Sequence, residues 1–322
     1  MRLHRGVPDE KLTADLLIVD LKDAPQYEAL SYVWGNSDER SSIYVNGQCI
    51  EVPKGAFEAL CGIRQPDCDR LVWVDAVSID QCSIEERNHQ VQLMHQIYGS
   101  PTKVLVYLGF ATEHSREGML ILQALLQTSG MTSGNLWPHS PPIDVQKYLA
   151  DIFQRPWFTR MWTVQEAALA GSISLVCGSQ QVSWTVDFKT MRAMVFRVKS
   201  WAISPYLFPN RDTTSTLDWS PLLMILEAQM RQAAQREGVP VRRSQLDLAH
   251  DFKDRLCADP RDKYYAIAGI IESEQTGRSL EFRPDYSLRL EEVRQQFTEA
   301  VWRFYAEDEP LEDERKFWAC RI

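Results

Sequence analysis

The sequence has no long apolar run, no excess of basic residues and no apolar leader. No stretch reaches the roughly 18 consecutive apolar residues of a membrane-spanning helix, and the first residues lack the apolar segment of a secretory signal. Lysine and arginine number 35 against 44 aspartates and glutamates, so the net charge is −9, without the basic face of a nucleic-acid-binding protein. We therefore expect a cytoplasmic protein with no nucleic-acid or membrane partner.

Disulfide and metal-site patterns are also missing. The seven cysteines are an odd, scattered set in a chain of 322 residues, which is typical of free thiols in a reducing cytosol. None of the six histidines belongs to a His-Glu-x-x-His pattern, and no cysteines have Cys-x-x-Cys spacing. The sequence therefore predicts no protein-ligated metal and no bound cofactor.

Three common catalytic signatures are absent as well. The chain has no Gly-x-Gly-x-x-Gly fingerprint, no Walker loop and no Gly-x-Ser-x-Gly elbow. This excludes the usual sequence patterns of dinucleotide-binding, phosphate-binding and α/β-hydrolase sites. Any chemistry must come from polar residues placed inside aromatic and apolar segments.

What the sequence does contain is a strand–helix–strand pattern between residues 71 and 109. Residues 71–77 are apolar and rich in β-branched side chains, and Ser83 with Glu86 forms a capping box at the start of a helix. Pro101 ends this helix, and residues 103–108 form a second apolar run. The pattern predicts a βαβ unit whose two strands are parallel and buried.

Polar residues lie at the expected carboxyl end of the first of these strands. Asp75 interrupts the strand, and Asp80 and Gln81 follow it. Ligands of open α/β sheets bind just beyond the carboxyl ends of the strands. These three residues, with Arg87 on the following helix, are therefore candidate binding residues.

The rest of the sequence shows both strand and helix patterns before about residue 185, and mostly helix patterns after it. Asn46-Gly47 predicts a tight hairpin, and much of 110–151 has the composition of an irregular surface insertion. We expect an α/β domain over 1–185 and a mostly helical extension over 186–322 packed on it. The predicted strands are 12–21, 27–34, 43–45, 49–52, 71–77, 103–108, 173–177 and 181–184. The predicted helices are 54–64, 83–100, 119–126, 156–170, 187–200, 218–236, 245–257, 262–272 and 289–305.

Other candidate site residues are polar groups inside aromatic segments. Ser31 and Tyr32 interrupt the strand at 27–34 beside Trp34. On the helix predicted after Pro156, Phe158, Trp162 and Glu166 follow at i, i+4 and i+8, so we expect them to share one face. Partial burial of a carboxylate on an aromatic face disfavours its charged form and raises its pKa.

Each candidate also has a purely structural interpretation. Glu166 can be a boundary residue paired with Arg160 or another cation, and Asp75 can cap a loop or the next helix. Arg87 can be solvated or structural. The tryptophans at 34, 157 and 162 can be core residues, since large aromatic side chains usually bury area.

Five spaced blocks of the sequence resemble the heterokaryon incompatibility (HET) domain of filamentous fungi. The first is Tyr-Glu-Ala-Leu-Ser-Tyr-Val-Trp-Gly at 27–35, and the second is Val-Trp-Val-Asp-Ala-Val-Ser-Ile-Asp-Gln at 72–81. The others are the helix and strand at 86–109, the Arg-Pro-Trp-Phe-Thr-Arg-Met-Trp segment at 155–162 with Glu166, and Asp-Pro-Arg-Asp-Lys-Tyr-Tyr-Ala at 259–266. The family is implicated in nonself recognition and in the cell death that follows fusion of incompatible hyphae.

The HET domain in turn is similar to the Toll/interleukin-1 receptor (TIR) domain. This resemblance implies a flavodoxin-like, open, mostly parallel sheet flanked by helices, with a β-hairpin insertion. It also matches Ser31-Tyr32 and the Trp-x-x-x-Glu of Trp162 to Glu166 to features of TIR domains. Enzymatic TIR domains cleave the nicotinamide–ribose bond of NAD, with the helix glutamate essential.

Two functions remain open from the sequence. In the first, Glu166 is the catalytic carboxylate of an NAD(P)- or nucleotide-cleaving enzyme in cell-death signalling, with NAD as candidate substrate. In the second, the chain is a non-catalytic module that acts by self-association or by binding another signalling protein. The position of Glu166 in the fold distinguishes them. An enzyme needs this carboxylate to face a concave pocket next to Ser31 and the Asp75 strand end, whereas a carboxylate that points to bulk solvent or is locked to an arginine favours the module.

Overall fold

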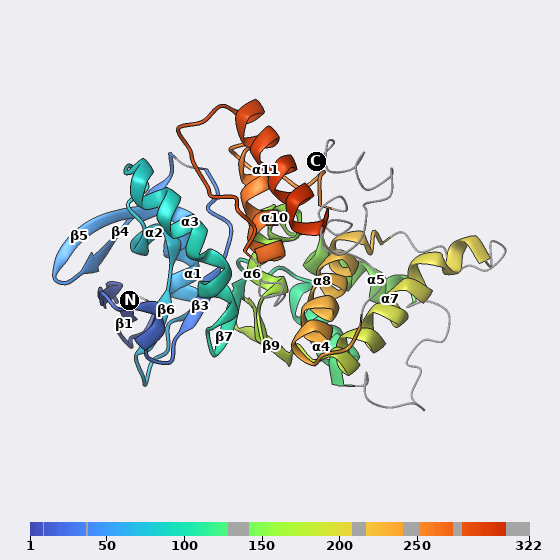
Figure 1. Cartoon of the computed structure of the whole chain (residues 1–322). Helices are drawn as coiled ribbons and strands as arrows, with labels where there is room; N and C mark the ends of the chain where they lie inside the picture. The colour runs from blue at the N-terminus through green and yellow to red at the C-terminus, as the bar shows by residue number, and fades with distance from the viewer. Residues whose placement is uncertain are drawn as a thin grey trace.

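The computed structural model describes residues 1–8, 10–36, 38–127, 142–207, 217–240, 252–272 and 279–306. Within them, nine strands form one mixed sheet in the order β5-β4-β2-β1-β6-β3-β7-β8-β9 (Figure 1). The strands are β1 (Arg2–Leu3), β2 (Thr13–Asp15), β3 (Glu28–Ser31), β4 (Arg40–Val45), β5 (Gln48–Pro53), β6 (Arg70–Trp73), β7 (Lys103–Tyr107), β8 (Ser172–Cys177) and β9 (Gln180–Thr185).

Most of the parallel pairing lies at the centre of the sheet, although β2 and β4 also pair in parallel. β3 pairs in parallel with β6 and β7, and β7 pairs in parallel with β8. The hairpins β4–β5 and β8–β9, and the short β1, add antiparallel pairings on either side. The expectation of a mostly parallel sheet is therefore correct for the central strands. It is wrong for the whole sheet, because the hairpins and β1 add antiparallel strands beside the parallel ones.

The predicted βαβ unit is present in a wider form. β6 and β7 run in the same direction, but β3 lies between them and pairs with both. The connection between β6 and β7 therefore crosses over one strand. As a result, the carboxyl ends of β3 and β6 lie side by side.

The helices surround the sheet and extend beyond it (Figure 1). In Figure 1, α10 and α11 lie above the sheet beside α3 and α6, and α7 and α8 lie on the right of the view. The helical elements are η1 (Leu21–Asp23), α1 (Lys54–Ile63), α2 (Asp75–Ser78), α3 (Ile84–Gly99), α4 (Ser115–Gln127), α5 (Ile143–Phe153), η3 (Pro156–Thr159), α6 (Trp162–Ala168), α7 (Phe188–Leu207), α8 (Ser220–Arg236), α10 (Asp262–Glu272) and α11 (Leu290–Ala306).

Local turn and cap chemistry follows the sequence. Asn46 and Gly47 have φ angles of 51° and 77°, the left-handed conformation that a two-residue hairpin needs. Ser83 caps α3 by accepting a hydrogen bond from the Glu86 amide at 3.2 Å. The Glu86 carboxylate binds the Asp80 amide at 2.9 Å rather than that of Ser83, so the capping box is half formed.

Several predicted elements differ from the structure, and the strand predicted at 27–34 is among them, since it shortens to β3. The strand at 12–21 shortens to β2, and that at 71–77 ends at Trp73, after which α2 begins at Asp75. Residues 110–151 are not mainly irregular, because α4 lies within them and α5 begins there. Residues 128–141, in the Gly- and Pro-rich part, lie outside the described residues. Of the helix predicted at 245–257, residues 245–251 lie outside the described part, and 252–257 form turns and a bridge.

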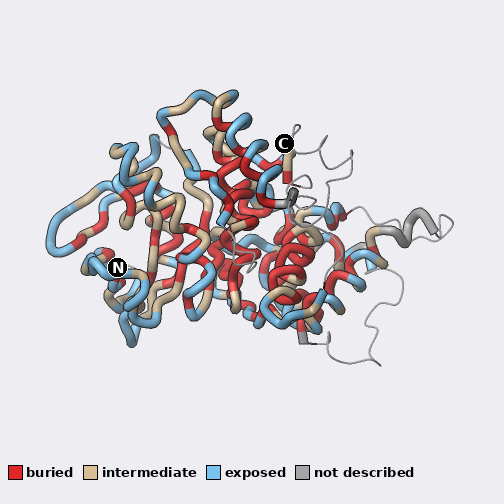
Figure 2. Tube along the Cα trace, viewed as in Figure 1, coloured by how far each residue is buried: buried red, intermediate tan, exposed pale blue. Residues whose placement is uncertain are grey.

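Three apolar clusters hold the fold together, and Figure 2 shows them as the buried centre of the molecule. One packs α1 against the sheet near β4, and another packs α10 against α11. The largest extends from β3 to α8 and includes Trp157 from η3 and Trp219 before α8. The apolar core thus continues across residue 185, and the domain division expected there stays a prediction.

Candidate active site

Three segments far apart in the sequence meet at the carboxyl ends of β3 and β6. Ser31 is the last residue of β3, Asp75 opens α2 just after β6, and Glu166 lies on α6. The register Ala29↔Trp73 explains the first two, because parallel neighbours end at the same edge of the sheet. We call Ser31, Tyr32, Trp34, Asp75 and Glu166 the carboxyl-end site.

Glu166 is held by a buried hydrogen-bond relay. The Ser31 hydroxyl donates to Oε2 of Glu166, and the Trp157 indole N–H donates to Oγ of Ser31 at 2.7 Å. Because the indole can only donate, the Ser31 proton is free to point at the ionised carboxylate. Ser31 and Glu166 are 1% and 7% exposed, so this relay is shielded from water.

Asp75 is held by three donors. Its two oxygens accept hydrogen bonds from the Tyr32 hydroxyl and the Trp34 indole, each at 2.7 Å. The Ala76 amide donates to the same oxygen as Tyr32 at 2.7 Å. The sequence predicted that Asp75 interrupts a strand, and this prediction is wrong. Asp75 instead opens α2 and orients two aromatic side chains toward the site.

Burial dominates the electrostatics of both carboxyl groups. The pKa of Glu166 is raised to about 7, mainly by burial and also by the nearby Asp75, while the Ser31 hydrogen bond and the charge of Arg160 oppose the shift. Burial also raises the pKa of Asp75, against its three hydrogen bonds and Arg160. The site thus holds two interacting carboxyl groups with raised pKa values, and the protonation of Glu166 changes near neutral pH.

Arg160 is the cation that influences this site most widely. Its charge acts on Glu166, Asp75, Tyr32 and Tyr98. Within the described part of the chain, no ion pair or hydrogen bond engages its guanidinium. Glu166 is therefore not locked to Arg160, which was the structural alternative for this carboxylate; its partner is Ser31.

The helix expected over 156–170 is broken, and this changes the predicted aromatic face. Residues 156–159 form the 3-10 helix η3, Arg160 is extended with ψ 146°, and α6 starts at Trp162. The prediction that Phe158, Trp162 and Glu166 share one helix face is therefore wrong for Phe158, which lies on η3. The break instead lets Trp157 reach Ser31.

Arg87 and Trp162 belong to a second group, centred on Asp262 at the start of α10. The Arg87 guanidinium lies 3.7 Å from the centre of the Tyr286 ring, and the Tyr286 hydroxyl donates to Asp262 at 2.6 Å. Tyr286 and Trp162 both lower the pKa of Asp262, against the larger effect of burial. These contacts connect α3 and α6 to α10 rather than to Ser31.

Asp80 and Gln81 lie in the turn before α3. Asp80 is exposed, and its carboxylate accepts from the Cys82 amide at 2.9 Å. Gln81 is half-buried in the same turn. The structure thus brings Ser31, Tyr32, Trp34, Asp75 and Glu166 together. The polar and ring contacts given above for Asp80, Arg87 and Trp162 are with other groups, and Gln81 lies in the turn before α3.

Sequence reasoning missed the roles of Trp157, Arg160 and Tyr98. Trp157 was expected only as a core residue, and Arg160 only as a possible ion-pair partner. The hydroxyl of the buried Tyr98 donates to the Leu30 carbonyl at 2.9 Å and so holds the end of β3. For Trp157 and Arg160, the one sequence feature that could have indicated these roles was their place in the aromatic segment at 155–162.

Neither a metal site nor a membrane helix is found in the part of the chain that the structure describes. No group of three or more histidine, cysteine, aspartate or glutamate side chains there could hold a metal ion. Among the same residues, no helix combines the length and apolar character needed to cross a bilayer. The six cysteines of that part are free thiols.

Comparison with known proteins finds a family model and a curated relative that are similar to parts of this chain. The family model for the heterokaryon incompatibility protein (HET) matches residues 27–166, which contain the whole carboxyl-end site. Heterokaryon incompatibility protein 6, OR allele, of Neurospora crassa is 24% identical over 317 residues, covering 82% of this chain and 45% of its own length. The chain thus spans less than half of that relative, and no solved structure matches it. On these matches, residues 27–166 are similar to a HET domain, and the chain as a whole is distantly similar to the Neurospora protein.

Proposed function

We propose that this chain acts in fungal nonself recognition and cell death by cleaving the nicotinamide–ribose bond of NAD or a related nucleotide. The observation that supports this most is the Glu166 carboxyl, bound to Ser31 and close enough to Asp75 for their charges to interact. A buried carboxyl with a pKa of about 7 beside a second carboxyl is typical of catalytic sites. The resemblance to TIR domains adds the substrate class.

The chemistry requires one stabilised cation and one water molecule. The bond between ribose C1′ and the nicotinamide nitrogen breaks, with its electron pair going to the ring nitrogen. Nicotinamide leaves as a neutral molecule, so the leaving group needs no proton. The ribosyl carbon becomes oxocarbenium-like, water bonds to it, and the water proton is released as the second product forms. A carboxylate beside that carbon stabilises the positive charge.

In this proposal Glu166 works in its ionised form. The nicotinamide ring of the substrate is cationic, so its approach favours the carboxylate and lowers the pKa of Glu166 from its value in the empty site. Ser31 orients the carboxylate, and the proton released by water can pass to it. Trp34, held by Asp75 and only partly buried, supplies an aromatic face that attracts the cationic ring.

A second candidate is a non-catalytic signalling module. It is favoured by the burial of the relay, since Glu166 is only 7% exposed. In that case Ser31, Trp157 and Glu166 serve only to hold α6 against β3. The protein then acts by self-association or by binding another signalling protein.

Nicotinamide release distinguishes the two functions. Purified protein, concentrated enough to self-associate, is incubated with NAD beside Glu166→Gln, which keeps the shape and the hydrogen-bond acceptor for Ser31. Glu113→Gln, which removes an exposed carboxylate outside the site, is the matched control. We expect release by the wild type and the control, and a loss of at least about 100-fold in Glu166→Gln. Absence of release by the wild type in every assembly condition would refute the enzymatic proposal.

Expression in a fungal host tests the signalling role separately. Wild-type protein should reduce viability, and an enzymatic mechanism predicts that Glu166→Gln is harmless at equal protein level. If both proteins are toxic, the module acts without catalysis. If neither is toxic at high expression, a death effector is excluded.

A further inference from the structure

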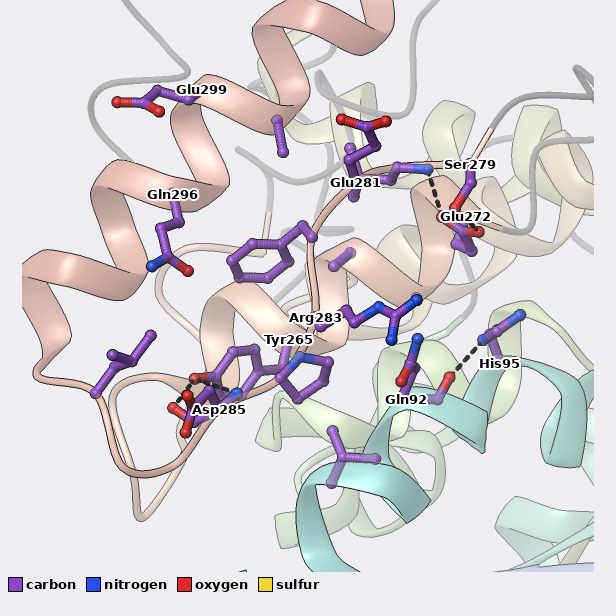
Figure 3. Close-up of a pocket in the computed structure, with 18 of the residues that line it drawn as sticks. Gln92, His95, Tyr265, Glu272, Ser279, Glu281, Arg283, Asp285, Gln296 and Glu299 are labelled. Atoms are coloured by element: carbon purple, nitrogen blue, oxygen red, sulfur yellow. Dashed lines mark hydrogen bonds between the residues drawn. The ribbon is translucent and has the colours of Figure 1, made fainter. Parts of the chain in front are cut away.

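A large cavity lies between the HET domain and the helices that follow it (Figure 3). It has a volume of about 740 Å³, within the range of small-molecule sites. One wall is the α3 face that carries Gln92 and His95, and another is the α10 face from Tyr265 to Glu272. The chain at 279–285 and α11 complete it. None of its residues belongs to the carboxyl-end site.

The acids of this cavity already have donors or cations beside them. Glu272 accepts hydrogen bonds from the Ser279 hydroxyl at 2.9 Å and the Leu280 amide at 2.6 Å. Asp285 accepts from the Ser287 amide at 2.8 Å and the Ser287 hydroxyl at 2.6 Å. On α11, Glu299 lies 3.9 Å from Arg303, which lies at the same distance from Glu281.

Arg283 is the exception among the charged groups of the cavity. Figure 3 shows its guanidinium directed between Gln92 below it and Glu272 above it. Over the described residues, neither a hydrogen bond nor an ion pair engages it. An arginine with all five donors available presents a planar fork that suits a carboxylate or a phosphate.

Two more polar groups lie beside that guanidinium in Figure 3, and both come from α3. The side-chain amide of Gln92 offers further hydrogen bonds. Nδ1 of His95 donates to the Gln92 carbonyl at 2.9 Å, which leaves Nε2 available for a ligand. Burial lowers the pKa of His95, although Glu272 opposes the shift, so an anion nearby would raise it again.

We propose that this cavity binds a small metabolite through an oxyanion, either a phosphate or a carboxylate, held by Arg283, Gln92 and His95. The apolar part of the ligand rests on Tyr265 and Phe282, whose rings pack together at 5.8 Å between centroids. The ligand touches α3 of the HET domain and also the segments that follow it. Binding therefore stabilises the contact between these two parts of the chain. The proposal is independent of the carboxyl-end site and its chemistry.

The test uses the full chain and three probes at constant ionic strength: inorganic phosphate, citrate and adenosine monophosphate. Binding is followed by calorimetry, by the melting temperature and by the NMR titration of the His95 imidazole. The variants are Arg283→Gln and the matched control Arg289→Gln, which removes an exposed arginine outside the cavity. We expect saturable binding of at least one probe, a raised His95 pKa and at least about tenfold weaker binding in Arg283→Gln alone.

The probes separate the two ligand sources. A response to phosphate and adenosine monophosphate identifies a phosphate site, and a response to citrate alone identifies a carboxylate site. If both arginine variants bind the probes more weakly than wild type by the same factor, the binding depends only on the net charge of the protein, and the proposal is overturned. The absence of saturable binding of all three probes up to about 10 mM, which corresponds to less than about 3 kcal/mol of affinity, would also overturn it.

Discussion

At the scale of single residues, the relay from Trp157 through Ser31 to Glu166 is the feature on which both candidate functions depend. The Trp157 indole donates a hydrogen bond to the Ser31 hydroxyl, which donates one to the Glu166 carboxylate, and all three side chains are buried. Removing the middle member leaves a donor and an acceptor unpaired, which costs more than one hydrogen bond contributes. The relay therefore matters for stability whether or not it matters for catalysis.

Ser31→Ala should destabilise the protein by about 2 kcal/mol, because it strands the Trp157 N–H and one Glu166 oxygen in the interior. It should also raise the pKa of Glu166, since the Ser31 hydrogen bond now lowers it. Urea unfolding measures the first effect. Ser100→Ala, at an exposed position after α3, is the control and should change little. Equal stability of the two variants would show that the relay contributes nothing.

Glu166→Gln should change how stability depends on pH. The folded-state pKa of about 7 lies above the ordinary value of 4.5, so folding takes up a proton between these two values. Stability from this group is complete below about pH 4.5 and is lost as pH rises through 7. The loss amounts to about 3 kcal/mol.

Glutamine cannot ionise, so the variant should gain stability relative to wild type between pH 5 and pH 8. Urea unfolding of both proteins at the two pH values measures the difference. Asp75 titrates in both proteins, and its contribution largely cancels in the comparison. A difference that does not change with pH would mean that Glu166 titrates normally in the folded state.

Five of the nine predicted site residues come together, and physical reasons separate them from the other four. Ser31, Tyr32 and Asp75 follow adjacent parallel strands, so sheet geometry alone places them at one edge. Glu166 could be assigned to this edge only by resemblance, because no local pattern says where a later helix packs. Arg87 and Trp162 were misplaced for the same reason, since their partners Asp262 and Tyr286 lie about 100 or more residues further along.

At the scale of elements, the position of α1 depends on Gly55. A Cβ at this residue would lie 2.0 Å from the Val33 carbonyl oxygen and 2.8 Å from that of Trp34. Only glycine lets the first turn of α1 approach the chain that leaves β3. Trp34 in turn reaches Asp75, so this approach also positions the site.

Gly55→Ala should therefore cost about 2–3 kcal/mol, because the methyl group meets backbone atoms that cannot rotate away. Gly99→Ala is the matched control, since nothing lies within 4 Å of its added Cβ. That variant should be neutral or more stable by up to about 1 kcal/mol. Thermal unfolding of both compares them directly, and equal effects would show that α1 can move without strain.

Elements with a strong local signal were predictable, and those that depend on distant packing were not. Asn46-Gly47, Ser83 and the apolar runs of β7 and β8 predicted their elements because turn and cap chemistry act locally. α5 was missed because prolines precede it, although Pro142 sits at its N-cap position. The break after η3 was missed because the Leu256 amide and carbonyl bind Thr159 and Met161, a pairing with a distant segment.

At the scale of the whole molecule, α8 completes the core of the part that precedes it. Gln229 is buried, donates to the Ala167 carbonyl at 3.0 Å and accepts from the Trp184 indole at 3.3 Å. Trp219, just before α8, packs on Phe153 of α5 with 6.1 Å between ring centres. The helices after residue 185 therefore satisfy polar groups and cover aromatic surface of the residues before it.

Residues 1–185 alone should consequently fail to form a stable fold. Their separation from α7 and α8 would expose the Phe153 ring and leave the Trp184 N–H and Ala167 carbonyl without their partners. Circular dichroism should then show no cooperative thermal transition for the fragment, whereas the full chain unfolds cooperatively. As a milder variant, Gln229→Ala in the full chain should keep the fold and lose about 1–3 kcal/mol, because the two freed groups stay buried. A fragment that is monomeric and unfolds cooperatively would show instead that residues 186–322 are a separable domain, and the HET domain would then be stable without them.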